Sequence, residues 1–66
     1  MAEPLDQGRR RALCERILEG DRNALVELAS LYHDAGYHRM AEVILAGTFS
    51  GAQNHARAFL GVTAYE

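Results

Sequence analysis

The chain has 66 residues, with seven arginines and no lysine against nine acidic residues, which gives a formal net charge of -2. A chain of this length predicts one domain, residues 1–66, which buries only about 60% of the surface that its unfolded form exposes. Because the large basic excess that usually accompanies duplex binding is missing, nucleic acid is not expected as the main partner.

The single cysteine, Cys14, excludes an intramolecular disulfide and a four-cysteine metal site. The start of the chain is acidic and lacks the apolar core of a signal peptide, and the longest apolar run, residues 43–46, is too short for a bilayer. We therefore expect a cytoplasmic protein that does not enter membranes. Codon bias in a GC-rich genome would explain the absence of lysine, so we expect a bacterial or phage source.

The first predicted helix begins near Pro4, a residue suited to a first helical turn, and ends at Gly20. Within it, Asp6 can pair with Arg9 or Arg10 at helical spacing. Its apolar stripe consists of Leu13, Cys14, Ile17 and Leu18.

Asp21 is the predicted N-cap of a second helix, and Gly36 is its predicted C-terminal stop. Between them, apolar residues recur at three- and four-residue intervals: Leu25, Leu28, Ala29, Tyr32 and Ala35. A third helix is predicted over residues 39–46, ending near Gly47. Because it is apolar around more than half of its circumference, we expect it to be the most buried of the helices.

Ser50 and Gln53 predict a capping box at the start of a fourth helix. Its narrower apolar stripe consists of Ala52, Ala56, Phe59, Leu60 and Thr63. Residues 12–20 align without gaps to residues 39–47, which leaves both duplication of a helix pair and coincidence open. The predicted fold class is all-α, with four short helices in antiparallel hairpins.

The spacing within residues 28–45 is the most informative pattern in the chain. A large and a small apolar residue are followed by an aromatic residue, a glycine and a second aromatic residue, and then by a small and a large apolar residue. This segment resembles one tetratricopeptide repeat unit, and the matching positions are Leu28, Ala29, Tyr32, Gly36, Tyr37, Ala41 and Leu45. The resemblance implies closely packed antiparallel helices that bind proteins rather than catalyse.

In repeats of this family, the first helix of each pair lines a concave groove through the face between its packing residues. In this chain that face carries Asn23, Val26, Ser30 and His33, and on the fourth helix His55, Ala58, Val62 and Tyr65. The family's clamp for peptide carboxylates needs several Lys, Arg and Asn side chains, of which only Asn23 is present. The resemblance therefore implies a mildly apolar protein-contact surface.

Arg9, Arg10 and Arg11 form the only run of charge. The run predicts either a solvated face or a grip on an acidic protein surface or phosphate backbone. Cys14 is expected to be a buried structural thiol, because no histidine or run of positive charge is evidently placed beside it.

His33, His38 and Glu42 are the best candidates for metal ligands, since they lie within reach of one another around the predicted turn at Gly36. No H-E-x-x-H or paired Glu-x-x-His motif accompanies them, so no metal site is predicted. On the simpler interpretation, His38 caps a helix start and His33 lies on a hydrated surface.

The sequence thus predicts a noncatalytic protein-binding module without a cofactor, such as an adaptor or cochaperone. Two alternatives stay open: a small phage-encoded inhibitor of a host defence complex, such as an anti-CRISPR protein, and a small metal-dependent enzyme or subunit using His33, His38 and Glu42. Solenoids need about three repeats for independent stability, so we expect a homodimer or a heterocomplex. The apolar residues expected to stay uncovered on the first and fourth helices are Leu13, Ile17, Phe59 and Val62.

Overall fold

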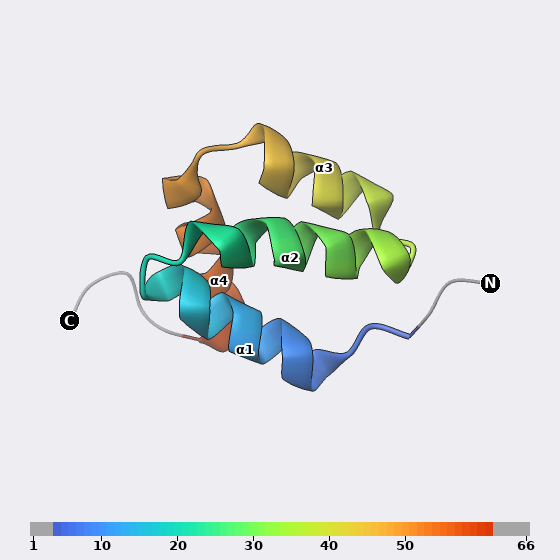
Figure 1. The fold of residues 1–66 in the computed structure, drawn as a ribbon, viewed down its shortest axis with the longest axis horizontal. Coiled ribbons are helices and arrows are strands. Elements are labelled where there is room, and N and C mark those ends of the chain that lie inside the picture. Colours follow the sequence, from blue (N-terminus) through green and yellow to red (C-terminus); the bar gives the residue numbers. More distant parts are fainter. Residues whose placement is uncertain (1–3, 62–66) are drawn as a thin grey trace.

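The computed structural model describes residues 4–61, and within that range it consists of four helices (Figure 1). They are α1 (Gln7–Leu18), α2 (Arg22–Asp34), α3 (His38–Ala46) and α4 (Phe49–Leu60). The predicted all-α class is confirmed. No helix in residues 4–61 combines the length and apolarity that crossing a membrane requires.

Aspartate side chains fix the starts of α1 and α2. Asp6 accepts a hydrogen bond from the backbone N–H of Arg9 at 3.0 Å, so α1 begins after Asp6 rather than near Pro4. Asp6 therefore acts as an N-cap, not as the predicted ion-pair partner of an arginine. Asp21 accepts a hydrogen bond from the backbone N–H of Asn23 at 3.0 Å, which confirms the predicted N-cap of α2.

The start of α4 differs from the prediction. Thr48 is its N-cap and accepts a hydrogen bond from the backbone N–H of Gly51 at 3.0 Å. Ser50 already lies inside the helix, and the Gln53 side chain donates instead to the carbonyl of Ile17 at 3.2 Å. The predicted capping box is therefore wrong, because Thr48 caps α4 and the amide of Gln53 donates a hydrogen bond to the C-terminal end of α1.

Two glycines in the left-handed region turn the chain back on itself. Gly20 follows α1 at φ +99° and Gly36 follows α2 at φ +91°. After Gly36, the N–H of Tyr37 donates to the carbonyl of Tyr32 at 2.8 Å, which satisfies an otherwise unpaired carbonyl at the helix end. Any other residue would be strained at these angles. His38 is the first residue of α3 rather than its cap, which corrects its predicted role.

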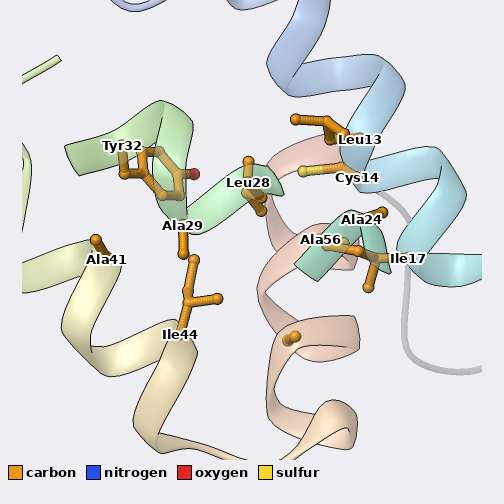
Figure 2. Close-up of a cluster of buried hydrophobic side chains, with 11 residues drawn as sticks. Leu13, Cys14, Ile17, Ala24, Leu28, Ala29, Tyr32, Ala41, Ile44 and Ala56 are labelled. Atoms are coloured by element: carbon orange, nitrogen blue, oxygen red, sulfur yellow. The ribbon is translucent and has the colours of Figure 1, made fainter. Parts of the chain in front are cut away.

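The helices pack around α2 (Figure 1). α1 and α3 lie on different sides of α2, and α4 packs mainly against α1 and more weakly against α2. The buried side chains form one cluster (Figure 2), consisting of Leu13, Cys14, Ile17, Ala24, Leu28, Ala29, Tyr32, Ala41, Ile44, Ala52 and Ala56. Cys14 is fully buried in this cluster, as predicted.

Two predictions about burial are wrong. α3 is not the most buried helix, because it packs mainly on α2 and buries only Ala41 and Ile44. α1 does not leave Leu13 and Ile17 uncovered, because α2 and α4 both pack against it. Phe59 is half-buried, and Val62 lies outside the described residues.

Candidate functional site

The large apolar side chains that stay exposed in residues 4–61 lie on α2, on α3 and in the turn between them. They are Val26, Tyr37, Met40, Val43 and Leu45. Each is at least one-third exposed, and Val43 reaches 62%. A concentration of exposed apolar side chains on one hairpin is typical of a contact surface rather than of scattered surface residues.

Three of the predicted surface residues line one groove. Val26, Ser30 and His33 lie along α2 and face a hollow of about 200 Å³ between α2 and α3. The other lining residues are Ala29, Asp34, Ala41, Glu42 and Leu45. Val26 and Leu45, one from each helix, are 57% and 56% exposed, so apolar surface is available on both sides of the groove.

Small residues set the depth of this groove. Ala29 on α2 and Ala41 on α3 are both almost completely buried and lie close together beside Ile44 (Figure 2). Their short side chains let the helix backbones approach closely, which leaves a shallow depression instead of a deep pocket. Such a depression can receive side chains from another protein, but it has no enclosed chamber for a small substrate.

The structure separates the remaining predicted residues from this groove. Asn23 and Ala58 are exposed and do not line it, and His55 lies on α4. Val62 and Tyr65 lie outside the described residues. The predicted surface is therefore not one continuous face in residues 4–61, since α4 packs mainly on α1 rather than beside α3.

His55 is held by an aromatic partner. Its Nε2 lies 2.7 Å from the hydroxyl of Tyr32, and the two rings meet edge to face with centroids 5.6 Å apart. Burial lowers the pKa of His55 from its ordinary value, and the nearby Arg10 guanidinium lowers it further. His55 also borders a smaller hollow between α3 and α4, which is lined by Met40 and Val43 among others.

The arginine run forms contacts within the chain instead of one free basic patch. Arg10 is half-buried, with its guanidinium carbon 4.0 Å from the ring centroid of Phe59 and 5.3 Å from that of Tyr32. Arg9 pairs with Glu27 at 3.6 Å, and Arg11 pairs with a glutamate one turn further along α1 at 3.7 Å. Arg9 and Arg11 therefore lie exposed on α1, whereas Arg10 packs against aromatic rings.

The candidate metal ligands come only partly together. The rings of His33 and His38 meet edge to face with centroids 4.4 Å apart, and His33 lies near the carboxylate of Asp34. No group of three or more His, Cys, Asp or Glu residues within residues 4–61 is placed to hold a metal ion. The arrangement therefore gives no support to the metal-dependent alternative.

Burial raises the pKa of the Cys14 thiol, so the thiolate that a nucleophile requires is disfavoured at neutral pH. The thiol is covered on α1 within the core shared with Ile17 and Ala56 (Figure 2). Cys14 has the properties of a packing residue.

Sequence reasoning missed the exposure of Met40, Val43 and Leu45 on α3. The sequence signal is present, since α3 is apolar around more than half of its circumference, but an apolar circumference does not by itself indicate burial. A helix with one main neighbour can bury only one side, so the rest of an apolar circumference stays open. The comparisons with known proteins add no assignment: the chain matches no protein-family model, no curated protein and no solved structure.

Proposed function

We propose that this chain is a noncatalytic protein-binding module, and that a protein partner docks in the groove between α2 and α3. The observation that carries the proposal is the pair of exposed apolar side chains, Val26 and Leu45, on opposite helices of one shallow hollow. Leaving both exposed gives no benefit to the isolated chain, whereas a partner that covers them gains the free energy of apolar burial.

The tetratricopeptide-like spacing supports the same proposal. Leu28, Ala29 and Tyr32 are buried on α2, and Ala41 is buried opposite on α3, as close packing in such a hairpin requires. We propose that the α2–α3 hairpin corresponds to one such unit and works as an adaptor or cochaperone surface in the cytoplasm of a bacterium. Identification of a host defence protein as the partner would favour the phage-borne inhibitor instead.

The same kind of charge substitution, made inside and outside the groove, tests whether the groove is the docking site. Val26→Glu and Leu45→Glu put a carboxylate into the groove. Ala58→Glu puts one at an exposed position of α4 outside the groove. Each variant is immobilised and exposed to lysate of the native host, and the retained proteins are identified by mass spectrometry. A specific partner should be retained by the parent and by Ala58→Glu but not by the groove variants.

The affinity for that partner is then measured by calorimetry. A central apolar anchor contributes about 2 kcal/mol or more, so each groove variant should bind more than about tenfold more weakly. His33→Ala should cost less, because it places no charge in the groove and leaves both apolar anchors in place. Equal binding by the parent, Val26→Glu and Leu45→Glu would refute the groove as the docking site.

A further inference from the structure

The groove between α2 and α3 has an uneven distribution of charge along its length. Its end away from the turn is apolar, because Val26 on α2 and Leu45 on α3 stay exposed there. Toward the turn, the lining includes two carboxylates, Glu42 on α3 and Asp34 at the end of α2. No arginine lines the groove within residues 4–61. The groove therefore offers apolar surface at one end and negative charge toward the other.

Arginines of the described chain do not neutralise these two carboxylates. Neither Glu42 nor Asp34 forms an ion pair with an arginine in residues 4–61, and both are exposed at the rim of the groove. His33 lies with its Nδ1 3.9 Å from the carboxylate of Asp34, but it is charged only when protonated. Three carboxylates outside the groove do pair with arginines, namely Glu15, Asp21 and Glu27.

The walls of the groove suit a helix better than an extended peptide. Both walls are helices, whose backbone N–H and C=O groups are bonded within each helix, so an extended peptide would find no backbone partners there. A helix satisfies its own backbone groups and needs only side-chain contacts. The hollow of about 200 Å³ is shallow, which fits side chains from one face of a helix.

The spacing of the lining residues sets the pattern that such a helix needs. Val26, Ser30 and Asp34 recur every four residues along α2, so Asp34 lies about 12 Å from Val26 along the helix axis. Glu42 lies one turn from Leu45 along α3, in the direction of the α2–α3 turn. A docked helix advances about 6 Å every four residues, so its next two turns after an apolar anchor pass Glu42 and then Asp34.

We propose that the groove binds a basic amphipathic helix of a protein partner. Its large apolar side chain lies between Val26 and Leu45, and its Arg or Lys side chains lie one and two helical turns further along, beside Glu42 and Asp34. This inference rests on the proposed function and names the chemistry of the partner. The apolar anchor supplies most of the affinity, whereas the exposed carboxylates orient the helix and repel acidic segments.

A library of displayed helical peptides tests this chemistry. The peptides share an alanine-rich helical host in which three positions, spaced four residues apart on one face, carry every amino acid. Phage that display them are selected on the immobilised parent chain at low ionic strength, where surface charges are least screened. Among peptides whose binding is lost with Val26→Glu, we expect enrichment of a large apolar residue at one end position and of Arg or Lys at the other two.

Neutral variants of the carboxylates then measure their contribution. Asp34→Asn and Glu42→Gln remove a charge with little change in size, so each should bind a selected basic peptide roughly two- to fivefold more weakly, and high salt should reduce this difference. Glu19→Gln removes a charge at an exposed position outside the groove and should bind like the parent. Asp34→Lys should prefer a peptide that has Glu two turns from the anchor. Circular dichroism shows whether each variant keeps its helices.

Three results would overturn the proposal. In the first, peptides that depend on Val26 show no preference for Arg or Lys, so the groove binds through apolar contact alone and the proposed function stands. In the second, a basic peptide binds the parent, Asp34→Asn and Glu42→Gln equally at low ionic strength. In the third, no selected peptide depends on Val26, so the groove does not bind helices. The lysate experiment then decides the proposed function separately, because it detects a partner of any chemistry.

Discussion

The three helices α1, α2 and α4 differ from α3 in how they are held. Side-chain hydrogen bonds link the three: Arg16 of α1 bonds Glu27 of α2 at 3.1 Å, Gln53 of α4 bonds α1, and Tyr32 of α2 bonds His55 of α4. In residues 4–61, no side-chain hydrogen bond or ion pair joins α3 to another helix. α3 is held mainly by apolar contacts.

This difference concerns how firmly each helix is held in place. Polar links have directional geometry and fix the mutual positions of α1, α2 and α4. α3 contacts α2 through Ala41 and Ile44, and most of its other side chains face outward. Val43 and Leu45 lie exposed on this less firmly held helix, and under the proposed function Leu45 contacts the partner in the groove.

The largest expected difference between the two regions is in the response to truncation of a leucine. Leu28→Ala removes a fully buried side chain from the core and should lower the free energy of unfolding by about 2–5 kcal/mol. Leu45→Ala removes a side chain that is 56% exposed on α3, and should change the free energy of unfolding by less than about 0.5 kcal/mol. Urea denaturation followed by circular dichroism measures both, and equal losses would contradict the assignment of α3 to the periphery.

Overpacking of the contact between α2 and α3 should have the next largest effect. Ala41→Leu inserts three carbon atoms where the two helices approach, and should cost about 1–3 kcal/mol. Hydrogen exchange should then accelerate in α3 more than in α1 and α4, because only α3 depends on this contact. Ala46→Leu, at an exposed site on the same helix, is the control and should leave the exchange pattern unchanged. A uniform acceleration over all four helices would show that α3 does not open separately from the other helices.

Arg10 tests whether its aromatic contacts contribute to the bundle. Arg10→Ala removes a guanidinium that stacks on Phe59 and Tyr32 together with its packed aliphatic stem, and should cost about 1–2 kcal/mol. Arg11→Ala removes only an exposed ion pair and should cost less than about 0.5 kcal/mol. Equal melting of both variants in thermal denaturation would mean that the stacking of Arg10 adds no stability.

The sequence carried enough information for the helices but not for their arrangement. Asp21, Gly20 and Gly36 mark helix ends through local chemistry, so those boundaries are readable from short segments. The packing of α4 on α1 depends on contacts distant in sequence, such as Gln53 with the carbonyl of Ile17, which no local pattern encodes.

The candidate site shows the same limit. Val26, Ser30 and His33 could be placed together because they share one face of α2, a matter of helical spacing alone. Leu45 and Glu42 belong to another helix, so only the packing of α3 on α2 brings them into the same groove. A repeated hairpin would place His55 on that surface too, whereas the observed packing turns it toward Tyr32.

The smallest expected difference is in the free energy of unfolding at acidic pH. Burial and the neighbouring Arg10 lower the pKa of His55 below its ordinary value of 6.5, so the folded chain holds this ring neutral where the unfolded chain protonates it. The unfolded state then binds more protons, and the free energy of unfolding falls as the pH falls below about 6.5. We expect urea denaturation at about pH 5 to show a less stable bundle than at about pH 7.

His55→Gln separates this contribution from the rest of the acid response. An amide can still hydrogen-bond the hydroxyl of Tyr32 but does not titrate, so the loss of stability between neutral pH and about pH 5 should be smaller than in the parent. Ala58→Gln is the control, because Ala58 is exposed on the same helix and the substitution adds an amide without removing a titratable group. It should keep the parent's dependence on pH. If His55→Gln leaves the dependence as steep as in the parent, the contact between Tyr32 and His55 is not the source of the acid response.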